Sequence, residues 1–213
     1  MNLQTEKYYW KKGYKIIVGL DEVGRGALCG PVTTAAVIIN SKFKIENKNF
    51  KEILKNAKDS KKLSEKQREK IFKLIQKCPN IKFTISSVGP KTIDKINISE
   101  ATEKAMKNCL NKIIPKCNLK NILILVDGNR IINKNIKIKQ IAIIKGDDKI
   151  FSIALASIIA KVTRDRKMEK LSLEYPKYYF HQHKGYGTKL HKKLIKKYGS
   201  CKIHRKSYRP IKK

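Results

Sequence analysis

Apolar runs separated by lysine-rich polar segments dominate the chain, and five of these runs predict β-strands. The first, over 16–20, leads into a glycine-rich turn, and a β-branched run over 32–39 follows it. Residues 81–88 alternate between apolar and polar positions, which is typical of a half-buried strand. The uninterrupted run at 122–126 predicts a buried central strand, and 138–144 predicts a further short strand. The chain therefore predicts a central mixed sheet of five strands.

Helical patterns lie between and after these strands. Ser64, followed three residues later by Gln67, predicts a capping box at the start of a helix. Ser99 is expected to cap another helix, whose first turn carries acids. Residues 150–162 are apolar on nearly all sides, which predicts a buried helix lying on the sheet. Together these elements predict an α/β fold in which helices flank the sheet and a C-terminal helical segment follows.

Length and charge narrow the class of protein. We expect one domain over 1–213, with a sheet-and-helix core at about 15–170 and a helical, basic segment at about 171–213. The chain has 50 Lys and Arg against 17 Asp and Glu, a net charge of +33, which makes nucleic acid the leading partner class. Biased lysine usage would also raise this charge. Net charge alone therefore does not separate an enzyme from a ribosome-bound protein.

Cysteine usage and hydropathy bear on the compartment. The five cysteines form no CxxC pair, and their odd number leaves one unpaired in any disulfide scheme. We therefore expect reduced thiols and a cytoplasmic location. The longest uncharged apolar stretch, 150–160, is shorter than the roughly 18–20 residues that cross a bilayer. We expect no role in a membrane.

Two adjacent acids, Asp21 and Glu22, follow the first apolar run, and the turn Gly24-Arg25-Gly26 comes next. In a strand these two side chains point to opposite faces unless the strand ends or twists there. A carboxylate at the end of an apolar strand is costly to desolvate unless a cation receives it. The candidates are a divalent metal ion or Arg25. The alternative is a solvated hairpin end with a surface ion pair.

A further acid, Asp127, follows directly after the buried run at 122–126 and is itself followed by a glycine. Acids at the ends of central strands lie where α/β folds place their ligands. The alternative is a turn in which Asp127 accepts hydrogen bonds from nearby backbone amides. Asp147 and Asp148 precede the apolar helix, where an aspartate most commonly acts as an N-cap.

The string from Gly19 to Val32, with its Asp-Glu pair and Gly-Arg-Gly turn, resembles the signature of type 2 ribonuclease H (ribonuclease HII). Similar motifs follow along most of the chain, namely Asp59-Ser60-Lys61, Asp127-Gly128, Lys145-Gly146-Asp147 and the stretch HKGYGT at 183–188. The resemblance implies a ribonuclease H-like fold. It also implies four catalytic, metal-binding carboxylates, which are Asp21, Glu22, Asp127 and Asp147.

The resemblance further implies the reaction. Ribonucleases of this type hydrolyse the RNA strand of RNA/DNA hybrids and cut on the 5′ side of ribonucleotides embedded in duplex DNA, leaving 3′-hydroxyl and 5′-phosphate ends. Two Mg²⁺ or Mn²⁺ ions on the shared carboxylates would activate water and stabilise the leaving oxygen. We expect a monomer that binds RNA/DNA hybrid and ribonucleotide-containing duplex DNA.

Substrate-binding residues follow from the same comparison. Backbone groups of Gly24, Arg25 and Gly26 and the hydroxyl of Tyr186 are expected to identify the ribose 2′-OH. The tyrosine would pack on the sugar of the neighbouring nucleotide, which its flanking glycines allow it to approach. The alternative for Tyr186 is a core-filling ring.

Basic and hydroxyl side chains supply candidate phosphate contacts. Lys61 either contacts phosphate or simply precedes a helix. Ser157, Lys161 and Arg164 are spaced three or four apart, so they share a helix face, and we expect phosphate contacts from the first two. Residues 164–166 are expected to form a charged outer end of that helix.

The C-terminal tail is basic and contains the pair His181 and His183. We expect these histidines to be solvated, because the sequence offers no third metal ligand nearby. The last ten residues, HRKSYRPIKK, are expected to grip the duplex backbone.

Three other functions fit less of the sequence. The glycines at 24, 26 and 30 miss the dinucleotide-binding GxGxxG spacing, and a strand follows where a helix should begin. A non-catalytic nucleic-acid-binding protein of the ribosomal type explains the charge but not four acids at element junctions. A general nuclease of related fold would cut all-DNA duplex equally well.

Overall fold

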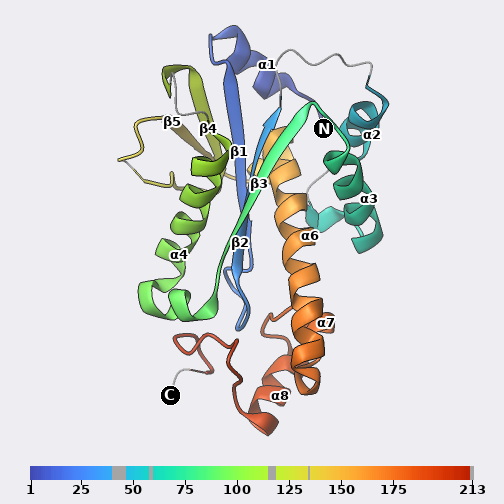
Figure 1. Cartoon of the computed structure of the whole chain (residues 1–213), viewed down its shortest axis with the longest axis vertical. Coiled ribbons are helices and arrows are strands. Elements are labelled where there is room, and N and C mark those ends of the chain that lie inside the picture. Colours follow the sequence, from blue (N-terminus) through green and yellow to red (C-terminus); the bar gives the residue numbers. More distant parts are fainter. Residues whose placement is uncertain (40–46, 58–59, 115–118, 134, 212–213) are drawn as a thin grey trace.

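Five strands form one mixed sheet in the computed structural model, which describes residues 1–39, 47–57, 60–114, 119–133 and 135–211. Asp59, part of one predicted motif, lies outside the described residues. The strand order is β3-β2-β1-β4-β5, with β1–β2 and β2–β3 antiparallel and β1–β4 and β4–β5 parallel (Figure 1). The strands are β1 (Ile16–Val23), β2 (Val32–Ile39), β3 (Ile81–Val88), β4 (Ile122–Asp127) and β5 (Lys139–Ile143). The predicted five-stranded mixed sheet is confirmed.

Two long helices cover the two faces of this sheet, α4 (Pro90–Ile113) and α6 (Phe151–Glu174) (Figure 1). Successive side chains along a strand point alternately toward α4 and toward α6, because they alternate between the two faces of the sheet. Val18 packs in a buried cluster with residues of α4, whereas Ile17 packs with the first turn of α6. The predicted buried helix is confirmed, since nearly every residue of α6 up to Val162 is buried.

The start of α6 lies directly on β1, and Gly19 makes this approach possible. A Cβ atom at Gly19 would lie 2.4 Å from the backbone carbonyl carbon of Ser152. The short helix α1 (Gln4–Lys11) closes the same end, because the Glu6 carboxylate accepts the Ser152 N–H at 2.8 Å. The N-terminal residues therefore fix where α6 begins.

Four further helical elements lie before β4 in the described part of the chain. They are α2 (Lys48–Asn56), the 3₁₀ turn η1 (Ser60–Lys62), α3 (Glu65–Gln76) and the 3₁₀ turn η2 (Leu119–Asn121). The capping box at Ser64 and Gln67 is confirmed, with both reciprocal hydrogen bonds present. The prediction that Ser99 caps a helix is wrong. Asn97 interrupts α4 with a φ of 64°, and its side-chain oxygen accepts the N–H groups of Ser99 and Glu100.

The C-terminal segment packs against the connection between β1 and β2. It contains the 3₁₀ turn η3 (Pro176–Tyr178), α7 (Phe180–His183) and α8 (Lys189–Tyr198) and follows α6 at the lower end of the molecule (Figure 1). Leu28 N–H donates to Gly185 O at 2.8 Å, and Gly30 N–H donates to Ile203 O at 2.9 Å. Two separate stretches of the tail thus hold this connection.

Among the described residues, no helix combines the length and apolar composition of a membrane-spanning segment.

Candidate active site

Three of the four predicted acids, Asp21, Asp127 and Asp147, come together on the side of the sheet that α6 covers. Each offers a carboxylate oxygen, and these three oxygens lie within 4.8 Å of one another. The register of β1 and β4 explains the first two. Leu20 pairs with Val126, so the next residues along both parallel strands are the two acids, which point to the same face.

The third acid arrives from α5 (Gly146–Lys149), the short helix after β5. Asp127 Oδ1 accepts the N–H groups of Gly146 and Asp147 at 2.7 and 3.3 Å. A Cβ atom at Gly146 would lie 2.7 Å from Ile153 Cδ1 and 3.1 Å from this oxygen, so glycine lets the loop close on Asp127. Asp127 therefore positions Asp147 through the backbone as well as standing beside it.

Glu22 lies outside this trio. It follows Asp21 within β1, so it takes the other side of the strand, and its Oε1 lies 3.3 Å from Arg25 Nη1. The Arg25 side chain is 51% exposed, and exposed pairs of this kind contribute little to stability. The sequence left both a metal ion and Arg25 as partners of these acids, and here Arg25 partners Glu22 alone.

The acids raise one another's pKa values. Burial, followed by repulsion from Glu22 and Asp127, raises the pKa of Asp21 well above its ordinary value. Burial and the neighbouring Asp147 raise the pKa of Asp127, and burial raises that of Glu22 although Arg25 opposes the shift. A group of buried carboxylate oxygens with this mutual repulsion fits a hard divalent cation such as Mg²⁺ or Mn²⁺.

Two of the three predicted phosphate contacts, Lys61 and Ser157, lie next to acids of the trio. Lys61 Nζ lies 3.0 Å from Asp147 Oδ2. Ser157 is 5% exposed, its hydroxyl lies 2.8 Å from that of Ser60, and its hydrogen bonding lowers the pKa of Asp21 against the larger effect of burial. The third, Lys161, pairs with Asp165 at 3.0 Å. Contacts of Lys61, Ser157 and Lys161 with phosphate stay predictions.

Tyr186 lies beside the Gly24–Gly26 turn, because its backbone forms a β-bridge with Ala27. The guanidinium carbon of Arg164 lies 5.3 Å from the ring centroid, and Lys161 Nζ lies 5.9 Å from it. A Cβ atom at Gly185 would lie 2.8 Å from Cys29 O, so this glycine allows the close approach of the two loops. The two predicted ribose-contacting elements are thus neighbours.

These motifs and this geometry belong to a known protein family. The model of the family described as Ribonuclease HII matches residues 18–211. The chain belongs to the ribonuclease HII family.

Individual relatives agree with the family model. The Ribonuclease HII of Caldicellulosiruptor saccharolyticus is 47% identical over 207 residues, which cover 96% of this chain and 92% of the relative. That of Caldicellulosiruptor bescii is 45% identical over 205 residues, covering 96% and 92%. The crystal structure of the ribonuclease H2 from Pyrococcus horikoshii matches with a TM-score of 0.72 and 30% identity, covering 92% of this chain and 95% of that one. This ribonuclease HII is therefore a metal-dependent endonuclease that degrades the RNA of RNA/DNA hybrids.

Arg164 has a different place in this ribonuclease HII from the one predicted. The expectation that residues 164–166 form a charged outer end is wrong for Arg164, which is fully buried, and for Asp165, which is 5% exposed. Its guanidinium donates to the carbonyl oxygens of Pro31, Lys184 and Cys29 at 2.9, 2.9 and 3.2 Å. A Cβ atom at Gly24, where φ is 87°, would lie 2.1 Å from Arg164 Nε. The arginine thus fills the space that the glycine leaves.

Arg205 is a supporting residue that the sequence did not reveal. The tail around it was expected to grip duplex, which is wrong for this side chain because it is fully buried. Its guanidinium donates to the carbonyl oxygens of Gly24, Arg25 and Gly30 at 2.7, 2.8 and 3.0 Å. No local pattern distinguishes Arg205 from its exposed basic neighbours. Arg164 and Arg205 together hold the loop that contains the Gly24–Gly26 turn from two sides.

The histidines of the tail also differ from expectation. His181 is exposed as predicted, but His183 is only 7% exposed, so the prediction of a solvated pair is wrong for it. His183 Nδ1 accepts the Gly185 N–H at 3.2 Å, and its Nε2 lies 2.9 Å from Tyr178 O. His183 therefore orders the loop that carries Tyr186.

Proposed function

We propose that the chain, besides degrading the RNA of RNA/DNA hybrids, cuts on the 5′ side of single ribonucleotides embedded in duplex DNA. The observation that carries this proposal is the trio Asp21, Asp127 and Asp147, whose carboxylate oxygens lie within 4.8 Å of one another beside a glycine-rich turn. Glu22 is the proposed fourth ligand. It would leave Arg25, whose side chain is 51% exposed and can be solvated in place of the carboxylate.

The carboxylates suit two divalent ions, either Mg²⁺ or Mn²⁺. When bound, such ions supply an activated water and stabilise the leaving oxygen of the phosphodiester. The chain holds the ligands ready, since Asp21 Oδ1 accepts the Glu22 N–H at 2.7 Å and Asp127 Oδ1 accepts two N–H groups. Carboxylates fixed in this way lose little freedom when they bind cations.

Substrate selection is assigned to the Gly24–Gly26 turn and Tyr186. The β-bridge between Ala27 and Tyr186 places the two elements side by side. Both would therefore meet the same stretch of a bound strand. Space around Gly26 is open, since apart from its two chain neighbours no atom of the described residues lies within 4 Å of a Cβ built there, so a sugar can reach its backbone. We assign recognition of the ribose 2′-OH to these backbone groups and the tyrosine hydroxyl. The net charge of +33 supports binding to the phosphate backbone.

The decisive experiment uses a DNA duplex that contains one ribonucleotide, with Mg²⁺ or Mn²⁺ added. We expect cleavage by the unaltered protein, no cleavage by Asp127→Asn, and duplex binding by both. Asp148→Asn is the matched control, because Asp148 is an exposed acid next to Asp147 in α5 and pairs with Lys62. Equal cutting of all-DNA duplex would show a general nuclease, and binding without cleavage would show a non-catalytic nucleic-acid binder.

Lys61 gives a second test of the site. Its ammonium group neutralises Asp147 across 3.0 Å although the side chain is 79% exposed, so it competes with a cation for this carboxylate. We expect Lys61→Met to tighten Mn²⁺ binding to the substrate-free protein, measured by calorimetric titration. We also expect a severalfold higher KM, since the displaced ammonium is the proposed phosphate contact.

The control for this variant is Lys62→Met, which removes a neighbouring lysine paired with the exposed Asp148. It should leave Mn²⁺ affinity unchanged. Weaker Mn²⁺ binding by Lys61→Met would contradict the competition between Lys61 and the metal.

A further inference from the structure

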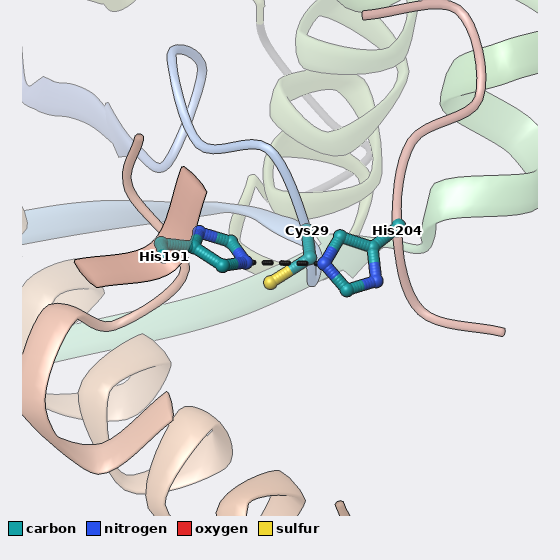
Figure 2. Close-up of side chains that lie close together, drawn as sticks. All are labelled: Cys29, His191 and His204. Carbon is teal, nitrogen blue, oxygen red and sulfur yellow. Dashed lines mark hydrogen bonds between the residues drawn. The ribbon is translucent and has the colours of Figure 1, made fainter. Parts of the chain in front are cut away.

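A chain of hydrogen bonds runs through the buried C-terminal core to the loop that carries Tyr186. The Cys201 N–H donates to His204 Nδ1 at 2.9 Å, His204 Nε2 lies 3.1 Å from His191 Nε2, and His191 Nδ1 lies 2.9 Å from Tyr186 O. Figure 2 shows His191 and His204 meeting edge to edge with the Cys29 side chain beside them. Both histidines are fully or almost fully buried.

The two ends of this chain determine where the protons are. His204 Nδ1 faces a backbone N–H, so it accepts, and the single proton of a neutral ring sits on Nε2. His191 Nδ1 faces a carbonyl oxygen, so it donates, and its Nε2 carries a lone pair. His204 Nε2–H therefore donates to His191 Nε2. Burial lowers the pKa of both imidazoles to about 4, so both rings are neutral near pH 7.

A metal ion is the competing interpretation, because Cys29 Sγ and one nitrogen of each histidine lie within 4.8 Å of one another. The proton count is against it. A metal on both Nε2 atoms would leave His204 with no proton on either nitrogen, since its Nδ1 already accepts from Cys201. A ligating histidine ordinarily donates from its second nitrogen. Burial raises the pKa of Cys29 to about 12, so this side chain is a thiol unless a metal ion displaces its proton.

We propose that His191 and His204 are positioning residues, which act as a neutral pair with fixed tautomers to hold the Tyr186 loop against the Gly24–Gly26 turn. This inference rests on the proposed function, in which Tyr186 contacts the ribose. Neither histidine belongs to the acid cluster. They affect the reaction only by fixing the position of Tyr186.

Contacts around the pair support this role. The ring of His183, which accepts the Gly185 N–H, stacks on His191 with centroids 4.2 Å apart. Phe180 packs edge-on against His191 at 5.6 Å, so the imidazole is fixed from several sides. Tyr186 O also accepts the Thr188 N–H at 2.8 Å, so the histidine is one of two donors to this carbonyl. Loss of His191 should therefore loosen the loop without releasing it.

The tautomers are tested directly by two-bond ¹H–¹⁵N correlation spectra of the full chain with ¹⁵N-labelled histidine at neutral pH. We expect a proton on Nδ1 of His191 and on Nε2 of His204, with metal analysis of the same sample showing no stoichiometric Zn²⁺. The opposite tautomers, a charged ring, or one bound Zn²⁺ that is lost in Cys29→Ser would overturn the proposal. None of these readouts needs catalytic activity.

The positioning role is tested by kinetics on duplex with one ribonucleotide. We expect His191→Leu to lower kcat/KM by about tenfold, the size of one lost hydrogen bond, and His191→Asn to stay within about threefold because its amide can still donate to Tyr186 O. In a Tyr186→Ala background, His191→Leu should change kcat/KM by less than about twofold. His204→Leu and the donor-retaining His204→Gln repeat this comparison if the His191 variants fail to fold.

The outcomes separate the two proposals. If the unaltered protein does not cleave, the proposed function fails and the positioning role fails with it. If it cleaves, but His191→Leu lowers kcat/KM by the same factor with and without Tyr186→Ala, only the positioning role is overturned.

Discussion

Asp21→Asn is expected to reduce cleavage by at least about a thousandfold and, at the same time, to stabilise the metal-free protein. Asp21 is 6% exposed, and burial and the neighbouring acids raise its pKa well above the ordinary value. The asparagine keeps the oxygen that accepts the Glu22 N–H but removes the buried charge. We expect the melting temperature without metal to rise by a few degrees at neutral pH.

The pH dependence gives the sign of this effect. Because the folded-state pKa of Asp21 lies above its unfolded value, the protein binds this proton more tightly when folded. The resulting stability is present at pH values below the unfolded pKa and is lost as the pH rises through the folded one. The gain in melting temperature from Asp21→Asn should therefore grow as the pH rises from acidic to neutral.

With metal ions bound, the unaltered protein should be more stable than Asp21→Asn, the reverse of the metal-free order. Mn²⁺ binds the folded state and so should raise the melting temperature of the unaltered protein more than that of Asp21→Asn. Asp148→Asn, which removes an exposed acid outside the trio, should change neither activity nor this response. If metal-free Asp21→Asn melts below the unaltered protein at neutral pH, repulsion among the acids does not govern the site.

Arg205→Met is expected to lower the free energy of unfolding by about 3 kcal/mol, because two buried carbonyl groups lose their arginine donors. These are the carbonyls of Gly30 and of Gly24, which retains the long Ala27 N–H contact at 3.4 Å, whereas that of Arg25 keeps the Tyr208 hydroxyl at 2.8 Å. Methionine fills much of the space, so the effect reports the hydrogen bonds more than a cavity. Urea unfolding measures the change.

The same variant should also impair substrate selection, since Arg205 holds both ends of the Gly24–Gly30 loop. We expect a larger loss of kcat/KM on duplex with one ribonucleotide than loss of duplex affinity. Arg209→Met is the matched control, because it removes the same charge from an exposed position in the same segment. Equal small effects of the two variants would show that Arg205 contributes only net charge.

The acid site and the sheet were largely predictable because both follow from local rules. An apolar run with a period of two specifies a strand and its two faces, and a carboxylate at the end of such a run is costly without a cation. Asp21 and Asp127 share a face because β1 and β4 are parallel and in register up to Leu20 and Val126. The sequence supplied each acid, and the resemblance to ribonuclease HII selected Asp147 over Asp148.

The sequence by itself determined the strands, the buried helix and the acids that follow the apolar runs. Only the tertiary structure decided that Arg164, Arg205 and three histidines are buried supports of the Gly24–Gly26 turn and the Tyr186 loop. The two arginines donate to carbonyl groups far away in the chain, 133 residues for Arg164 with Pro31 and 181 for Arg205 with Gly24. A basic tail ordinarily remains in water, and burying its arginines is favourable only where a distant loop presents carbonyl oxygens in the right places.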